Sequence, residues 1–357
     1  MKSIHLLPAS ILLAACFSSC NFIVKKRLYM PGYYVDWVDL GRNAPRKNEA
    51  ALSVNVYDAL SVKPIQETCI PVDMASTIYL NEGTSINFPS KAFVYENGKT
   101  VQCDKVCVYT WEFYTLSDII ASGLSTTSGK RMLVSGGMIY VEVTCCGERL
   151  KLRPGKRIEV RMPAGEDPEK MRLFAGKMQN GIVDWKSQGK AILANAALYP
   201  PSDSAKYAVE GDWEVDGIPI TDGVLEAEYE GEYEGGDPTY LMKSTALGWI
   251  NCDRFYDIEK KTTLAVTADT SRKTYVAIVF TNIKSVMPGY YNKDNIAEFT
   301  GIPKGEDVKV LAYRVDEKKK VAVVGMKDVT LGEEKKVDLD MEEMSLDEFK
   351  TLLAGFN

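Results

Sequence analysis

Residues 138–152 read Met138-Ile-Tyr-Val-Glu-Val-Thr-Cys-Cys-Gly-Glu-Arg-Leu-Lys-Leu152 and predict an antiparallel β-hairpin. Apolar and polar residues alternate on both sides of Cys146-Gly147, and a period of two places the apolar ones on one face of a strand. A two-residue connection that contains glycine is typical of a hairpin turn. The alternating apolar positions are Ile139, Val141, Val143, Leu150 and Leu152.

The same pattern recurs along the chain and predicts an all-β fold of two β-sandwich domains, because short apolar runs broken by turn residues are typical of sandwiches. Between about Leu52 and Pro163, strands are predicted around Val54 and Val56, Ile78 and Leu80, Val106 and Val108, and Ile158 and Val160, with a second turn at Asn97-Gly98. Later strands are predicted at Thr263–Thr267, Tyr275–Phe280, Val308–Tyr313 and Val321–Val324, with a turn at Pro303-Lys304-Gly305.

One short helix is predicted at the C-terminus. Ser345 suits its N-cap and Glu348 completes a capping box, while Gly355 suits its end. Its apolar residues share one face, which we expect to pack on the last domain. They are Leu346, Phe349, Leu352 and Leu353.

The N-terminus has the order of a bacterial secretion signal. Lys2 precedes an apolar run that is shorter than the roughly 20 residues a membrane-spanning helix needs. The run ends in Leu13-Ala-Ala-Cys16, which resembles the lipobox of bacterial lipoproteins, and Cys20 is the alternative lipid-bearing residue. We expect a lipid anchor on Cys16 and a location at the outer membrane, in its periplasmic or its cell-surface leaflet. An ordinary secreted protein is the other interpretation.

Composition and length predict five consecutive segments along the chain. They are a signal peptide (1–15), a lipidated tether (16–50), a first β-sandwich (51–163), a connecting β segment with an acidic linker (164–238) and a C-terminal β domain that ends in the helix (239–357).

Histidine is absent beyond the signal, because His5 is the only one in the chain. Ser-His-Asp and Cys-His catalysis and histidine-containing metal sites are therefore not expected, since each needs an imidazole. Loss of Lys2 with the signal moves the formal charge from -6 to -7, which disfavours a nucleic-acid partner. A pair of carboxylates, as in glycosidases, stays an alternative. We expect no cofactor.

Six cysteines follow the signal region, and their pairing is open. An exported chain meets an oxidising compartment, so some are expected to form disulfides, while a chain of this length also accommodates buried thiols. They are Cys69, Cys103, Cys107, Cys145, Cys146 and Cys252.

Several motifs lie between Ala75 and Pro163, in the order Gly83-Thr-Ser-Ile-Asn-Phe-Pro89, Ala92-Phe93, Asn97-Gly98, Thr110-Trp-Glu-Phe113, Asp118-Ile119, Leu133-Val-Ser-Gly-Gly-Met138, Gly147-Glu-Arg-Leu150 and Ile158-Glu-Val-Arg-Met-Pro163. Together they resemble a ZU5-type β-sandwich as found in Bacteroidetes envelope proteins. The resemblance implies a fold and no activity, since the motifs fall on turn and core positions. Some eukaryotic relatives cleave themselves at a His-Phe-Ser step, which this sequence lacks.

A second resemblance is carried by Ala246-Leu-Gly-Trp-Ile-Asn-Cys-Asp-Arg-Phe255. This segment is similar to one in uncharacterised Bacteroidetes surface lipoproteins, where it opens a C-terminal β domain. For the neighbours Asp253 and Arg254 we expect a buried structural ion pair beside Trp249 rather than a catalytic pair.

Three surface features are candidate ligand or modification sites. Glutamates alternate with other residues at Glu228, Glu230 and Glu232, so on a strand their carboxylates would point to one face. Oxygen ligands of this kind suit Ca²⁺. A solvated strand face or an acidic linker is the favoured interpretation. Ser204, in Asp203-Ser-Ala205, resembles the O-glycosylation motif of exported Bacteroidetes proteins and lies in an expected loop. The motif Met30-Pro-Gly-Tyr-Tyr34 recurs as Met287–Tyr291. Packing or coincidence is the favoured interpretation of this identity, and stacking of the paired tyrosines on sugar rings is the alternative.

These features predict a non-catalytic cell-envelope lipoprotein that acts as a structural, adhesion or assembly component. Its expected partners are the membrane, through the lipid, and other envelope proteins or glycans. The alternative is a glycan-binding or carbohydrate-active surface lipoprotein, which would use exposed aromatic residues and two carboxylates.

Overall fold

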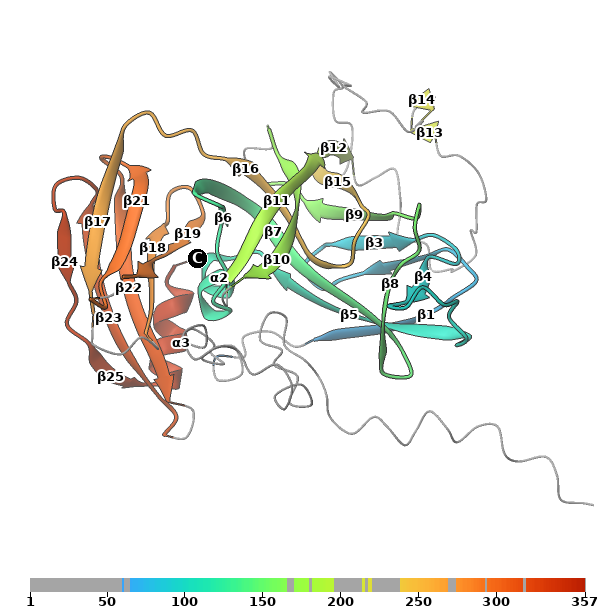
Figure 1. Cartoon of the computed structure of the whole chain (residues 1–357), viewed down its shortest axis with the longest axis horizontal. Helices are drawn as coiled ribbons and strands as arrows, with labels where there is room; N and C mark the ends of the chain where they lie inside the picture. Colours follow the sequence, from blue (N-terminus) through green and yellow to red (C-terminus); the bar gives the residue numbers. More distant parts are fainter. Residues whose placement is uncertain are drawn as a thin grey trace, which may run out of the picture.

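The computed structural model describes residues 60, 65–165, 170–179, 182–195, 214–215, 218–219, 238–268, 274–292, 294–316 and 319–356. These residues form a mostly β structure of several antiparallel sheets with a short C-terminal helix, as predicted. Figure 1 shows two groups of sheets that meet near the helices α2 (Leu116–Ala121) and α3 (Leu346–Ala354).

The N-terminal group, coloured blue to light orange in Figure 1, contains two large sheets. The first has the strand order β1 (Gln66–Pro71), β5 (Lys105–Phe113), β7 (Arg131–Cys145), β16 (Gly248–Phe255), β10 (Arg172–Gln179) and β11 (Ile182–Lys190), with β4 (Phe93–Tyr95), β6 (Thr127–Ser128) and β8 (Glu148–Leu152) paired beside it. The second has the order β12 (Ile192–Asn195), β15 (Pro238–Ser244), β9 (Ile158–Pro163), β3 (Ser85–Phe88) and β2 (Ser76–Tyr79). Strands β13 (Glu214–Val215) and β14 (Ile218–Pro219) pair only with each other.

Strand β7 crosses the middle of this group and is buried on both faces. Ile139, Val141 and Val143 belong to the apolar core of the N-terminal group, which strands of both sheets build. Met138 and Tyr140 contact a different cluster on the opposite face. The alternation of side chains along a strand explains how one segment serves two cores.

Both hairpin turns predicted in this group are confirmed. Cys146 and Gly147 connect β7 to β8 at φ values of 49° and 84°, as a two-residue type I′ turn requires. Gly98, at φ 83°, turns the chain after β4, where the Tyr95 N–H donates to the Lys99 carbonyl at 2.9 Å.

The C-terminal group contains two further sheets. Their strand orders are β20 (Tyr290–Tyr291), β21 (Ala297–Pro303), β17 (Lys261–Thr267), β24 (Lys336–Asp338), and β19 (Ser285–Pro288), β18 (Tyr275–Phe280), β22 (Asp307–Asp316), β23 (Val321–Thr330), β25 (Glu342–Ser345). Leu264 and Phe299 of one sheet share a core with Ile278 and Val310 of the other. The strands predicted from Thr263 to Val324 are thereby confirmed.

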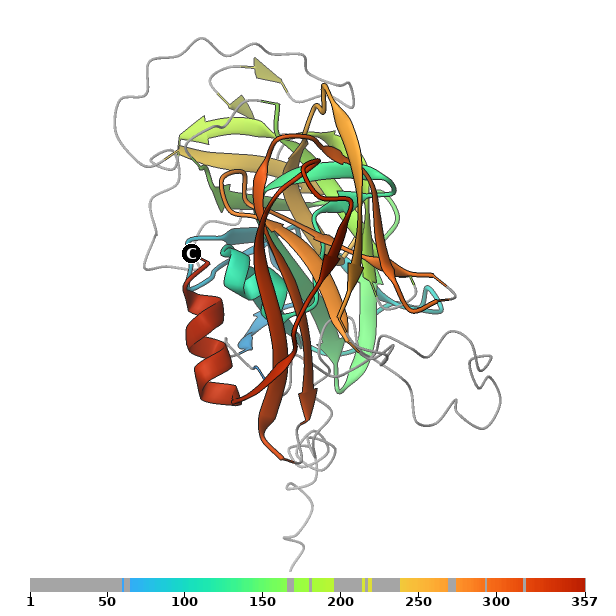
Figure 2. The same cartoon turned by 90° about the vertical axis from the view of Figure 1, so that its left-hand side faces the viewer.

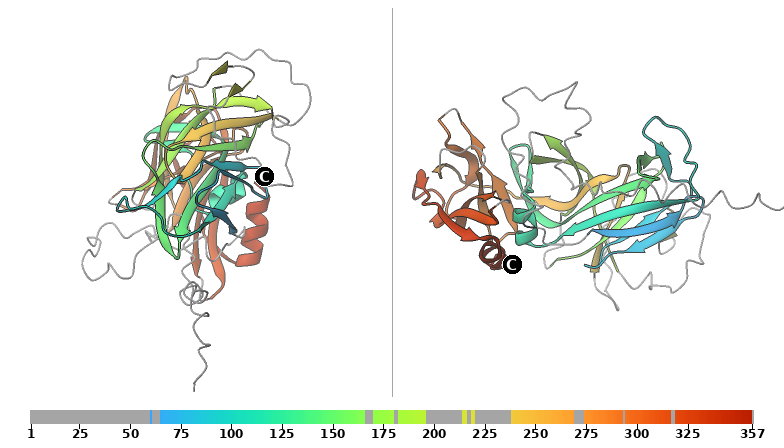
Figure 3. Two further views of the ribbon diagram at one scale, coloured as in Figure 1. Left: turned by 90° about the vertical axis from the view of Figure 1, so that its right-hand side faces the viewer. Right: turned by 90° about the horizontal axis from the view of Figure 1, so that it is seen from below.

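A third core cluster joins the two groups, which lie end to end in the right-hand view of Figure 3. Strand β18 contributes to it, because Ile278 and Phe280 point into the C-terminal core while Ala277 and Val279 point the other way. Its large side chains include Phe113, Phe174, Trp185, Trp249, Tyr275, Leu311, Tyr313 and Phe349.

Polar contacts reinforce this third core cluster, which we call the joint between the two groups of sheets. The buried Tyr313 hydroxyl donates to the Ile120 carbonyl at 2.6 Å. The Thr126 N–H donates to the Val286 carbonyl at 2.9 Å, and the Val286 N–H donates to Thr126 Oγ1 at 2.8 Å. Apolar burial and paired backbone groups therefore hold the two groups together.

Helix α3 forms as predicted and lies against α2, as Figure 2 shows. Ser345 Oγ accepts from the Glu348 N–H at 3.2 Å, and Glu348 Oε2 accepts from the Ser345 N–H at 2.8 Å, which completes the capping box. Phe349 and Leu353 are buried in the joint, and the Phe349 ring lies 5.0 Å from that of Tyr313.

The segment that was expected to open the C-terminal domain at residue 239 lies among the N-terminal sheets. Strand β15 pairs with β9, and β16 lies between β7 and β10, with Trp249 opposite Tyr140. The change between the two groups of sheets follows Phe255, so it does not coincide with the expected boundary. The cause is pairing between strands distant in sequence, which local patterns do not report.

Candidate functional site

The residues proposed from the sequence as anchor, modification and calcium sites lie outside the described part of the chain: Cys16, Cys20, Ser204, Glu228, Glu230 and Glu232. The second copy of the tyrosine motif is described. There the Tyr291 hydroxyl donates to the Thr274 carbonyl at 2.8 Å and the side chain packs against the C-terminal core, which supports the packing interpretation. Within the described ranges, no helix has the length and apolar character to cross a membrane.

Two disulfides pair four of the six cysteines, Cys69 with Cys107 and Cys103 with Cys145. Cys69 and Cys107 are direct partners in the β1–β5 ladder, so their bond ties the edge strand β1 to the interior of the sheet. The sequence did not decide between disulfides and buried thiols for these six cysteines, and the structure contains both.

The remaining two cysteines differ in exposure. Cys146 is exposed in the β7–β8 turn, whereas Cys252 is buried in β16. Burial, and secondarily the neighbouring Asp253, raises the pKa of the Cys252 thiol far above its usual range. Cys252 is therefore a protonated, unreactive core residue.

Three carboxylic acids are buried among the described residues, and they bear on the alternative of a catalytic carboxylate pair. Glu112 accepts hydrogen bonds from Gln66 Nε2 at 2.9 Å and from the Thr84 N–H at 3.2 Å. Asp118 accepts from the Thr115 N–H at 3.0 Å in the capping box of α2. Both side chains thus accept hydrogen bonds from donors that the fold places beside them, and this is a structural role.

The third buried acid, Asp253, lies where β16 meets a bulge opposite Ser135 and Gly137 of β7. Its Oδ2 accepts from Asn251 Nδ2 at 2.6 Å, while Asp253 Oδ1 and Asn251 Oδ1 have no hydrogen-bond partner. Asn251 and Asp253 are two apart on one strand, so they share a face, and Arg254 points to the other. The expected Asp253–Arg254 ion pair is replaced by this Asn251–Asp253 contact.

Burial raises the pKa of Asp253 to about 8, and the neighbouring Asn251, Ser135 and Gly136 oppose this shift only in part. The carboxyl is therefore mostly protonated at neutral pH, which lowers the cost of enclosing it. A raised pKa often marks a catalytic acid. Asp253 is fully buried and lines neither the surface hollow at Leu152–Arg157 nor the one at Lys130–Met132, so neither hollow gives it a route to a substrate.

A surface hollow of about 440 Å³ lies beside the joint, and we name it the Tyr256 crevice. Three distant segments line it: Lys130–Met132, Tyr256–Glu259 with Lys261, and Thr300–Gly301. Tyr256 is fixed because its hydroxyl donates to Glu306 Oε1 at 2.9 Å and its N–H donates to the Met132 carbonyl at 3.0 Å. Partial burial and then the Glu306 contact raise the pKa of Tyr256, so the phenol stays a hydrogen-bond donor.

The Tyr256 crevice combines an aromatic side chain with charges of both signs. The Arg131 guanidinium lies 3.4 Å from the centre of the Phe255 ring, a cation–π contact that holds it near the rim. Asp257 and Glu259 are exposed carboxylates, and Lys261 is an exposed cation. Such a mixture of donors, acceptors and one ring suits a polyhydroxylated ligand better than a single strong ion.

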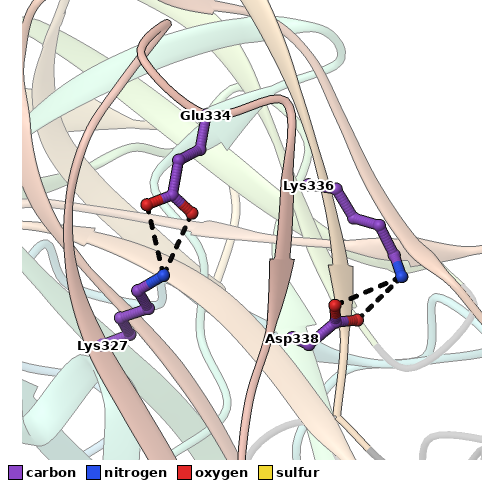
Figure 4. Close-up of polar contacts among 4 residues, drawn as sticks. All are labelled: Lys327, Glu334, Lys336 and Asp338. Atoms are coloured by element: carbon purple, nitrogen blue, oxygen red, sulfur yellow. Dashed lines mark hydrogen bonds and ion pairs between the residues drawn. The ribbon is translucent and has the colours of Figure 1, made fainter.

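Charges on the surface of the C-terminal sheets are paired with each other. Lys327 contacts Glu334 at 3.0 Å, and Lys336 contacts Asp338 at 2.9 Å, as Figure 4 shows. The hydrogen bond from Lys336 lowers the pKa of Asp338. This region therefore presents alternating charges and not a cationic surface for a polyanion.

Comparison with known proteins returns no match, whether with protein families, with curated proteins or with solved structures.

Two features escaped the sequence reasoning. The Tyr256 crevice gathers three segments that only the tertiary structure brings together. The burial of Asp253 was expected, but its contact with Asn251 was not, although these two residues are two apart on one strand and so share a face. Two polar residues on one face of a buried strand predict a hydrogen bond as readily as an ion pair.

Proposed function

We propose that this protein is a non-catalytic, lipid-anchored component of the cell envelope that serves structure, adhesion or assembly. Its location in this proposal is the outer membrane, with the anchor on Cys16 or alternatively Cys20. The lipobox-like Leu13-Ala-Ala-Cys16 supports the anchor. The two disulfides fit export, because such bonds persist in oxidising compartments.

The architecture in this proposal is two β-sandwiches on a lipidated tether. The first, ZU5-like sandwich is built from β1 to β12 with β15 and β16, and the second from β17 to β25 with α3. Each group of sheets has an apolar core of its own, which supports the division.

The observation that carries a structural role is the joint between the two groups. Independent domains usually meet over modest, polar interfaces and move relative to each other. Here Trp249, Tyr313 and Phe349 belong to one apolar cluster, and strands β7 and β18 each serve two cores. A joint of this kind holds the two groups of sheets in one fixed arrangement, which supports a structural or assembly role.

Lipidation in the native host tests the proposal. We expect the wild-type chain to incorporate an alkyne-tagged fatty acid and to fractionate with outer membranes. Cys16→Ser should abolish both, while Cys20→Ser, the matched control, should change neither. Labelling that is lost only in Cys20→Ser would place the lipid anchor on Cys20. Labelling that is retained when both cysteines are replaced by serine would refute a lipid anchor at either residue.

The Tyr256 crevice favours glycan binding as a second candidate function. Aromatic rings and placed polar groups are what sugar-binding hollows use. A panel of envelope and host polysaccharides, scored for binding and for new reducing ends, tests it. Binding lost in Tyr256→Ala but retained in Tyr79→Ala, an exposed tyrosine elsewhere on β2, would support this function. Turnover lost on changing one Asp or Glu would instead favour a carbohydrate-active enzyme.

A further inference from the structure

We propose that Cys103, Cys145 and Cys146 form a thiol–disulfide exchange site, in which Cys103 transfers its bond between two adjacent cysteines. The three Sγ atoms all lie within 4.8 Å of one another. Cys103 is bonded to Cys145, and the Cys146 Sγ lies 3.6 Å from the Cys103 Sγ. A thiol is thus held next to the sulfur that it would attack.

The backbone explains why two adjacent residues reach the same sulfur. Successive side chains of a strand point to opposite faces, so a regular strand would carry Cys146 away from Cys103. Cys146 instead adopts φ 49° in the type I′ turn, where Asn or Gly is usual. This conformation lets the Cys146 side chain approach Cys103 from the turn while Cys145 approaches it from the end of β7.

A neighbouring hydroxyl is placed at the leaving sulfur. The Tyr95 Oη lies 3.1 Å from the Cys145 Sγ, and Tyr95 must be the donor because Cys145 carries no proton in the disulfide. When the disulfide breaks, this hydroxyl donates to the Cys145 sulfur and stabilises the charge that develops there. Tyr95 is a positioning residue in this step.

The exchange needs no outside oxidant or reductant. The Cys146 thiolate attacks the Cys103 Sγ and forms a Cys103–Cys146 bond, while the Cys103–Cys145 bond breaks and its electron pair goes to the Cys145 Sγ. Cys145 then takes up the proton that Cys146 lost. One disulfide and one thiol are present before and after.

The two isomers differ in what they show to the solvent. With the Cys103–Cys145 bond, the thiol belongs to the exposed Cys146 and can react with another envelope thiol or disulfide. With the Cys103–Cys146 bond, the thiol belongs to Cys145, which is 3 % exposed. The exchange therefore decides whether the surface presents a reactive sulfur.

Disulfide mapping of the whole exported protein tests the proposal. The chain is denatured and alkylated with N-ethylmaleimide at about pH 5, where thiolate is scarce and exchange slow, and digested with trypsin without reduction. Cys103 falls in Thr100–Lys105, and Cys145 and Cys146 fall in Met132–Arg149. Fragmentation between Cys145 and Cys146 shows which one carries the label, and labelling of Cys252 confirms unfolding.

We expect the label on both Cys145 and Cys146 in the wild type, and a Cys103–Cys146 bond in Cys145→Ser. In the folded protein the isomer with the buried Cys145 thiol reacts with N-ethylmaleimide only after it exchanges back, and Tyr95→Phe should slow this phase about threefold, the effect of one lost hydrogen bond to the charged sulfur. Tyr79→Phe, which removes a hydroxyl from β2, should leave this rate unchanged. A wild type labelled at Cys146 alone overturns the proposal, as does a Cys145→Ser variant in which Cys103 and Cys146 are both labelled.

Discussion

Replacing Asp253 by asparagine should stabilise the protein at neutral pH and leave it nearly unchanged at pH 4. Asparagine has the shape of a protonated aspartate, so Asp253→Asn keeps the contact with Asn251 and removes only the ability to ionise. In the unfolded chain the carboxyl titrates near its ordinary pKa of 3.8, whereas in the folded protein it titrates at about 8.

The sign and size follow from proton linkage. Between these two values the unfolded state releases a proton that the folded state retains, so wild-type stability falls as pH rises and falls no further above about pH 8. Each pH unit in this window costs about 1.4 kcal/mol, which amounts to about 4 kcal/mol by pH 7. The variant does not bear this cost, so its advantage grows from near zero at pH 4 to about 4 kcal/mol at pH 7.

Urea denaturation of both proteins from pH 4 to pH 8 measures this difference. The other carboxylates are common to both chains and cancel in the comparison. Asp257→Asn, in the exposed Tyr256 crevice, controls for the replacement of one carboxyl by an amide. A difference in the free energy of unfolding that stays constant across this range, or a variant that is less stable than wild type at pH 7, would refute the reasoning.

Three further predictions concern the disulfide, the joint and the acidic segment. Replacing Cys69 and Cys107 together by alanine should cost about 4 kcal/mol, because the bond closes a loop with a sequence separation of 38; an unchanged urea midpoint would contradict it. Phe349→Ala should cost about 3 to 5 kcal/mol and lower a single calorimetric transition, since the ring fills the joint; separate melting of two parts in the wild type would contradict a shared core. Calorimetry should detect no saturable Ca²⁺ binding, and binding that disappears when three glutamates become glutamine would overturn this expectation for Glu228, Glu230 and Glu232.

Local structure was readable from the sequence. The strands predicted around Ile78, Val106, Ile139 and Ile158 and between Thr263 and Val324 followed from side-chain periodicity, and the positions of the turns at Asn97-Gly98 and Cys146-Gly147 followed from residues with special backbone preferences. The C-terminal helix followed from Ser345 and Glu348, because a capping box involves residues only three apart. Each of these features depends on neighbours in the chain, so a single sequence suffices to predict them.

What the tertiary structure decided is which distant segments meet. The sequence of β16 does not indicate that β7 and β10 are its neighbours in the sheet. The domain boundary expected at residue 239 therefore did not coincide with the change between the two groups of sheets. Six cysteines allow many pairings, and only the register of β1 with β5 and the turn at Cys146 select among them. The lining of the Tyr256 crevice has the same origin. Each depends on contacts between residues far apart in sequence, and local patterns carry no record of such contacts.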